Sequence, residues 1–176
     1  KGFQHGCVDY LTKPIDKLEL YHRVQVYLQH IQQRRDLEMM SFIDPVTGVT
    51  NRRTYEFMLQ KEWNRSIRYA SCVCLLVMDL DDFKEINDSF GHDIGDDFLR
   101  NIALKLQSVL KKIISKNNYN LYSQISRIAG DDFVVLLKGN NLKEISSQIA
   151  TELLDNISDK IFLDDKSVYP SATLGI

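Results

Sequence analysis

The most informative stretch of the sequence is Cys72-Val73-Cys74-Leu75-Leu76-Val77-Met78-Asp79-Leu80-Asp81-Asp82. Its first part is continuously apolar, which is typical of a strand buried on both faces in the centre of a sheet. The run then ends in acidic residues at positions 79, 81 and 82. We therefore predict a central strand over residues 72–80 that brings carboxylates to one end of a sheet.

The segments around this strand alternate between helical and strand-like patterns. Asn51 is a suitable N-cap for the first helix, and helices are predicted over residues 52–69, 83–88, 93–114 and 142–156. Two β-rich runs, 121–128 and 133–138, flank a short Gly- and Asp-containing turn and predict a hairpin. A further strand is expected to start at Val168. This alternation predicts an α/β (α+β) fold with helices packed on a sheet.

Residues 15–40 carry a separate helical pattern. Apolar side chains recur at intervals of three or four residues, at Leu18, Tyr21, Val24, Leu28 and Ile31. A surface helix and a helix that pairs with its twin in a dimer explain this stripe equally well. We therefore predict two parts: residues 1–40, the end of a preceding domain with a linker helix, and residues 41–176, a second domain.

Composition excludes several classes of protein. The chain has 176 residues, with 22 Lys and Arg against 24 Asp and Glu, so it offers no electrostatic footprint for nucleic acid. Its longest apolar run, 72–78, is far shorter than the roughly 20 residues of a membrane span, and we expect no signal peptide. Cys72 and Cys74 lack the spacing of zinc or redox pairs. A cytoplasmic protein with reduced thiols is expected.

Acidic residues form two clusters, each next to a predicted strand: Asp79, Asp81 and Asp82, and then Asp131 and Asp132. Hard divalent cations prefer oxygen ligands, and Mg²⁺ combines one or two carboxylates with phosphate oxygens and water. Such a site suits attack on a nucleotide phosphate. For either cluster alone, however, turn capping by Asp is the simpler explanation.

Between the clusters lie polar residues that suit a nucleotide. Asn87 and Asp96 offer the amide and carboxylate that a guanine edge needs, and Lys84 offers a point charge for phosphate. Taken singly, each is better explained as a solvated or capping residue, because an acid near a helix start is stabilised by the helix dipole. His92 alone is best explained as structural.

Together these residues resemble the GGDEF family of diguanylate cyclases. The resemblance is carried by Asp79-Leu80-Asp81-Asp82-Phe83-Lys84-x-Ile86-Asn87-Asp88-x-Phe90-Gly91-His92-x-x-Gly95-Asp96 and by Arg127-Ile128-Ala129-Gly130-Asp131-Asp132-Phe133. Residues 44–53 are similar to the opening segment of that domain. The resemblance implies a central, mostly antiparallel sheet flanked by helices, like the palm of nucleotidyl cyclases. Gly6, Asp9-Tyr10-Leu11 and Lys13-Pro14 resemble the end of a response-regulator receiver.

The resemblance also implies an activity and its partners. Two protomers of a homodimer would each bind GTP, and each 3′-hydroxyl would attack the other α-phosphate, giving cyclic di-GMP and two pyrophosphates. An upstream phosphorelay kinase would act through the receiver.

Roles carry over by matching position. Asp79, the carbonyl of Leu80 and Asp131 would hold Mg²⁺ or Mn²⁺. Asn87 and Asp96 would bind guanine with His92 nearby, while Lys84 and the backbone of Asp82 and Phe83 would meet the phosphates. Asp132 would assist metal binding or deprotonation, and either Asp131 or Asp132 could be the base.

Several departures from the family pattern favour a second hypothesis. The signature reads Ala-Gly-Asp-Asp-Phe over residues 129–133, where the family has Gly-Gly-Asp-Glu-Phe. The sequence stops at Ile176, before a family helix that bears a Lys and an Arg for the phosphates. The alternative is therefore a catalytically lapsed module that binds GTP or a partner in signalling or dimerisation. Asn120 and Ser123 occupy the positions of the family's inhibitory Arg and Asp, so product inhibition there is not expected.

Overall fold

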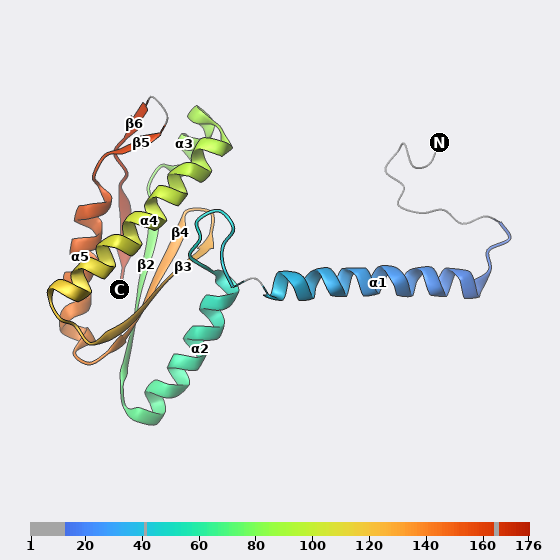
Figure 1. Ribbon diagram of the computed structural model, residues 1–176, viewed down its shortest axis with the longest axis horizontal. Helices are drawn as coiled ribbons and strands as arrows, with labels where there is room; N and C mark the ends of the chain where they lie inside the picture. Colours follow the sequence, from blue (N-terminus) through green and yellow to red (C-terminus); the bar gives the residue numbers. More distant parts are fainter. Residues whose placement is uncertain (1–12, 41, 164–165) are drawn as a thin grey trace. The chain divides into compact units, whose positions relative to one another are not determined.

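The structure, a computed structural model, describes residues 13–40, 42–163 and 166–176. The chain divides into two compact units, Lys1–Ser41 and Phe42–Ile176. In the first unit, helix α1 spans Lys17–Met40 (Figure 1), which confirms the predicted helix. Gly6 and Asp9-Tyr10-Leu11, which carry part of the resemblance to a receiver, lie outside the described residues.

The apolar stripe of α1 faces solvent. Each of its five side chains, at positions 18, 21, 24, 28 and 31, is at least 46% exposed. Within the first unit, no described residue covers this stripe.

The described residues of the second unit form further elements in the order β1 Thr50–Asn51, α2 Arg52–Tyr69, β2 Cys72–Leu80, α3 Phe83–Phe90, α4 His92–Lys116, β3 Leu121–Ala129, β4 Asp132–Gly139, α5 Leu142–Ile157, β5 Ile161–Leu163, β6 Lys166–Val168 and β7 Ala172–Gly175. Among the described residues, five strands form a sheet in the order β1-β3-β4-β2-β7, in which the β1–β3 pair is parallel and the other pairs are antiparallel. The predicted mostly antiparallel sheet is confirmed. Within the described helices, none is long and apolar enough to cross a membrane.

Local signals explain where the helices begin and end. The Oδ1 atom of Asn51 accepts a hydrogen bond from the backbone N–H of Thr54 at 3.0 Å, so Asn51 caps α2 as predicted. At the other end, Ala70 adopts a left-handed conformation with φ 49°, and its N–H donates to the carbonyl of Ser66. Left-handed C-caps of this kind stop a helix without leaving its last carbonyls unpaired.

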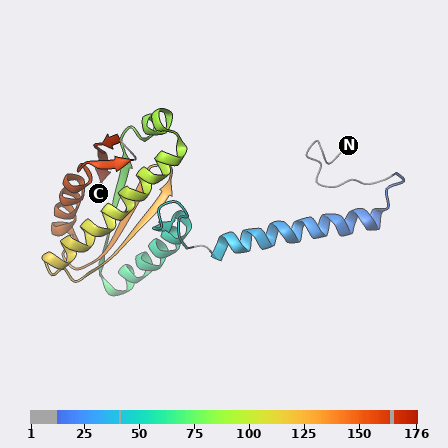
Figure 2. The ribbon, with the colours of Figure 1, turned by 45° about the horizontal axis from the view of Figure 1, so that its top comes forward.

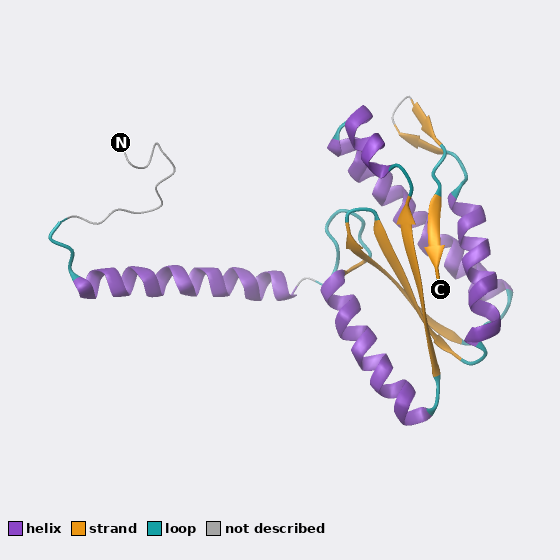
Figure 3. Cartoon of the chain, turned by 180° about the vertical axis from the view of Figure 1, so that it is seen from behind, coloured by secondary structure: helices purple, strands orange, loops and turns teal. Residues whose placement is uncertain are grey.

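Helices cover the two faces of the sheet unequally. Figures 2 and 3 show α2 on one side of the sheet and α4 and α5 on the other. The side chains of Leu76, Met78 and Leu80 on β2 are at most 1% exposed and join the core with residues of α4 and α5. The main hydrophobic core therefore lies between the sheet and the α4–α5 layer.

The prediction that β2 is buried on both faces was wrong. The strand is central in the sheet, but Val77 is 48% exposed and Asp79 is exposed on the face that α2 covers only in part. Leu59 and Trp63 of α2 line a groove with Val73 and Leu75, at the start of the strand. Because α2 packs against that first half, the end of β2 stays open to solvent.

The strand predicted from Val168 onward is divided. Strand β6 ends at Val168 in a separate hairpin with β5, and β7 begins only at Ala172. Pro170 lies between them and has no N–H for a strand ladder, which explains the interruption.

Removal of the α2 cap should lower stability. Asn51→Ala deletes the acceptor for the N–H of Thr54, and the expected loss is about 1 kcal/mol of unfolding free energy. Urea denaturation measures it, with Asn51→Asp as the control that retains an acceptor. Equal midpoints for the Ala and Asp variants would show that the cap contributes nothing.

Candidate functional site

Two carboxylates face each other at the open end of the sheet. Asp79 on β2 is paired directly with Asp132 on β4, and residues opposite each other in a ladder project from the same face. Loss of hydration, followed by the nearby carboxylates of Asp132 and Asp81, raises the pKa of Asp79 above its ordinary value. Negative groups held this close favour a bound cation between them.

The hairpin turn places the second acidic cluster beside the first. Gly130 and Asp131 form the turn between β3 and β4, and Gly130 has φ 48°, a conformation that favours glycine. A bulge interrupts the ladder between Arg127 and Ala129. Ala129 has no positive φ, so the backbone accepts alanine where the family pattern has glycine. Asp131 thus lies one residue before Asp132, in the turn itself.

The start of α3 offers backbone N–H groups next to these acids. Asp82 has φ 58°, and its carbonyl accepts hydrogen bonds from the N–H groups of Glu85 and Ile86. Phe83 and Lys84 occupy the first turn of α3, where unpaired N–H groups attract anions. The side chain of Lys84 is exposed. This end of α3 can therefore meet phosphate oxygens.

The two residues predicted to bind guanine lie on adjacent helices. Asn87 of α3 and Asp96 of α4 are both half-buried. A Cβ atom on Gly95 would overlap the Oδ1 atom of Asn87, so the Asn87 amide lies directly against the first turns of α4. His92 is the exposed first residue of α4. The structure thus brings Asn87 beside the backbone that carries Asp96.

The described residues offer few protein ligands for a metal. Among them, no group of three or more His, Cys, Asp or Glu side chains is placed to hold a metal ion. The facing carboxylates of Asp79 and Asp132 nevertheless suit Mg²⁺, which needs only one or two carboxylates and takes its other ligands from carbonyls, phosphates and water.

Sequence reasoning missed one link to the hairpin. Arg127 donates from Nη1 to Oδ1 of Asp44 at 3.1 Å and from Nε to the carbonyl of Gly130 at 2.8 Å. The two charged side chains are only 13% and 18% exposed. Arg127 therefore ties the hairpin turn to the segment that opens the second unit. The partners are 83 residues apart in sequence, and no local pattern signals such a pairing.

Asp44 is also bonded within its own turn. Its Oδ1 atom accepts from the backbone N–H of Thr47 at 2.9 Å and from the Thr47 hydroxyl at 2.6 Å. Burial pushes the pKa of Asp44 up, but the hydrogen bonds from Thr47 and Arg127 outweigh it, so the pKa lies below its ordinary value.

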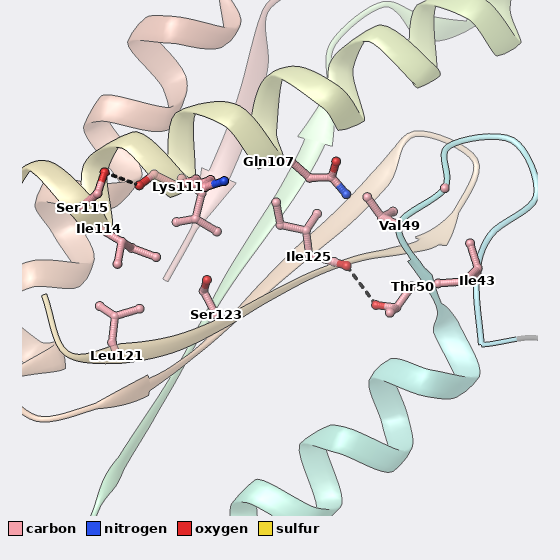
Figure 4. A pocket seen from close by; sticks show the side chains of 12 residues that line it. Ile43, Val49, Thr50, Gln107, Lys111, Ile114, Ser115, Leu121, Ser123 and Ile125 are labelled. Carbon is pink, nitrogen blue, oxygen red and sulfur yellow. Dashed lines mark hydrogen bonds between the residues drawn. The ribbon is translucent and has the colours of Figure 1, made fainter.

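A separate groove lies between α4, β3 and the segment around Val49 (Figure 4), with a volume of about 580 Å³. Its walls are mainly apolar, with Gln107, Lys111 and Ser123 among the polar groups. None of the acidic residues described above is in its described lining. The groove is therefore distinct from the candidate site.

The tie between Arg127 and Asp44 predicts a pH-dependent stability. A carboxyl with a lowered pKa stabilises the fold above its unfolded value, about 3.9, and this contribution is lost as the pH falls through the folded pKa. Asp44→Asn should therefore cost about 1–3 kcal/mol at pH 7, and the gap to the wild type should shrink below pH 4. Thermal melts across pH 3–7 test this, with exposed Asp155→Asn as the control. A gap independent of pH would contradict it.

Comparisons with known proteins identify the family. The profile of the family described as "Diguanylate cyclase, GGDEF domain" matches residues 41–176. Probable diguanylate cyclase DgcC of Escherichia coli (strain K12) is 37% identical over 108 residues, which cover 61% of this chain and 27% of DgcC. Response regulator PleD of Caulobacter vibrioides is 32% identical over 169 residues, which cover 92% of this chain and 35% of PleD.

The fold is likewise shared with solved structures. The GGDEF domain of PA1120 (TpbB or YfiN) from Pseudomonas aeruginosa superposes with a TM-score of 0.66 at 30% identity, over 76% of this chain and 73% of that one. This chain spans only about a quarter to a third of the curated relatives DgcC and PleD. The family profile nevertheless extends over the whole of the second unit, from the opening segment through both acidic clusters. The chain therefore belongs to the GGDEF family of diguanylate cyclase domains.

Proposed function

We propose that this protein is a diguanylate cyclase that condenses two GTP molecules into cyclic di-GMP and two pyrophosphates. The observation that carries the proposal is the facing of Asp79 and Asp132 at the open end of the sheet, next to the start of α3. Membership of the GGDEF family supports the same activity.

The acidic residues would hold the metal. Asp79, the carbonyl of Leu80 and Asp131 are its proposed ligands, and Asp132 faces Asp79 across the ladder. Bound Mg²⁺ or Mn²⁺ would neutralise phosphate charge and polarise the α-phosphate for attack. Either Asp131 or Asp132 takes the proton from the attacking 3′-hydroxyl, and the other of these two acids assists metal binding.

The helices would bind the nucleotide. Lys84 and the N–H groups at the start of α3, including that of Phe83, contact the phosphates. Asn87 and Asp96 bind the guanine edge, with His92 at the neighbouring start of α4. Because a site built from buried hydrogen-bonding groups rejects a base that leaves them unpaired, this pair selects GTP over ATP.

The reaction needs two copies of the site. The single nucleotide site proposed for each protomer supplies one GTP, so a homodimer brings the two together. The exposed stripe of α1 provides an apolar surface for pairing with a second copy. The likeness to Response regulator PleD supports control by an upstream phosphorelay kinase through a receiver-like N-terminal part.

A second candidate is a module that binds GTP without turning it over. The shorter Asp132 in place of the family Glu favours it, because the carboxyl group reaches less far from the strand. Binding of GTP with Mg²⁺ but no formation of cyclic di-GMP by the dimer would identify this function.

Loss of Asp79 should remove metal-dependent nucleotide binding. Asp79→Ala deletes one of the facing carboxylates, and we expect GTP affinity in the presence of Mg²⁺ to fall at least about tenfold, the loss of one charged contact of about 1.4 kcal/mol. Isothermal titration calorimetry measures it, with Asp155→Ala as the control. Unchanged binding by the Asp79 variant would contradict the assignment.

Charge on the α1 stripe should weaken the dimer. The double variant Leu28→Glu and Ile31→Glu places like charges on the apolar stripe where the two α1 helices would pair. Its specific activity should therefore fall more steeply on dilution than that of the wild type. Activity and light scattering across a concentration series measure this. His30→Glu adds charge to another side of the same helix and is the control. A monomeric double variant with full activity would refute the need for a dimer.

A further inference from the structure

We propose that Gly95 is a positioning residue for base recognition. Because Gly95 has no side chain, the Asn87 amide can pack against it in the position from which it binds the guanine edge. This inference rests on the proposed GTP-binding function and adds a residue that does not itself contact the nucleotide.

The first observation is the closeness of the two residues. Gly95 is buried in the first turns of α4. An ideal Cβ atom on Gly95 would overlap Oδ1 of Asn87 and would lie 3.0 Å from its Cγ atom and 3.6 Å from its Nδ2 atom. The whole amide group of Asn87 therefore packs over the space that any other residue at position 95 would fill.

The second observation is that hydrogen bonds and an aromatic stack link α3 and α4 around these residues. The chain turns from α3 into α4 at Gly91, which has φ 88°, and the N–H of Gly91 donates to the carbonyl of Asn87 at 2.9 Å. The N–H of Gly95 in turn donates to the carbonyl of Gly91 at 3.1 Å. The rings of Phe83 and Phe98 stack across the same two helices, with centroids 6.1 Å apart.

These contacts determine which part of the structure would move if a methyl group were added at position 95. Both helices are anchored by backbone hydrogen bonds and by the aromatic stack, whereas the end of the Asn87 side chain can rotate. A methyl group at position 95 would therefore displace the Asn87 amide and leave the helices in place. The guanine edge would then lose one of its two proposed partners.

Helix propensity supports this explanation of the glycine. Glycine inside a helix is less favourable than alanine, because it loses more backbone freedom on folding. Gly95 needs no unusual backbone conformation, since its φ is not positive. The contact with Asn87 is the feature at this position that a side chain would disturb.

A double-mutant cycle on the whole chain tests the inference. GTP and ATP affinities, each with Mg²⁺, are measured by calorimetry for the wild type, Gly95→Ala, Asn87→Ala and the double variant. We expect each single variant to lose at least tenfold in GTP affinity and most of the preference for GTP. The double variant should lose no more than Asn87→Ala alone, because the amide that Gly95 positions is already absent.

Thermal melting separates this role from a purely structural one. Gly95→Ala should melt no lower than the wild type and up to roughly 2–4 °C higher, because alanine favours the helix. Asn101→Ala, on an exposed part of α4, is the control for substitution in that helix and should leave both affinities unchanged. A lowered melting temperature with an unchanged preference for GTP would overturn the inference.

The binding outcomes also separate the inference from the proposed function. Wild-type preference retained by Gly95→Ala but lost by Asn87→Ala would overturn the role of Gly95 and leave the proposed function standing. Independent, additive losses in the double variant would overturn it as well. A wild-type chain that binds no GTP with Mg²⁺ would instead refute the proposed function on which the inference rests.

Discussion

Eight residue pairs join β2 to β4, from Cys72 with Gly139 to Asp79 with Asp132, and the register of this ladder determines which groups meet at the site. Because side chains alternate between the faces of a strand, a slip of one residue would turn Asp132 towards the buried face and leave Asp79 without its neighbour. The register is fixed by the core, since Leu76, Met78 and Leu80 must face α4 and α5. Packing of the core on one face of the sheet therefore determines which carboxylates lie next to each other on the other face.

Three further features converge on the same end of the sheet. The limited cover from α2 leaves Asp79 accessible, and the left-handed Asp82 turns the chain at once into α3. Arg127 donates hydrogen bonds both to the carbonyl of Gly130 in the hairpin turn and to the carboxylate of Asp44. Each feature is a local backbone or packing constraint, and together they surround one small polar region with acids and helix N-terminal N–H groups.

Much of the fold could be predicted because its signals are local. The apolar run and its acidic end gave the bounds of β2, and Asn51 gave the start of α2. The half-open face of β2 could not be predicted, because it depends on how far α2 extends over the sheet and not on the composition of the strand. Strands β5 and β6 have three residues each, too few for a periodic pattern.

The residues of the candidate site could be proposed from the sequence, but the contacts between them could not. Acids at strand ends and an Asn–Asp pair on consecutive helices are visible in sequence, and the matching family pattern implies the roles that we propose for them. The link from Arg127 to Asp44 and the packing of Asn87 on Gly95 depend on tertiary geometry that no spacing reveals. Pairings of this kind appear only once the sheet order and the helix crossing are known.

The most direct test of the central claim is a crystal structure of the chain with Mg²⁺ and a GTP analogue that cannot react. Our account predicts a metal ion about 2.0–2.1 Å from a carboxylate oxygen of Asp79 and of at least one hairpin acid, with guanine against Asn87 and Asp96. A nucleotide bound in the groove between α4 and β3, with no metal at Asp79, would contradict it.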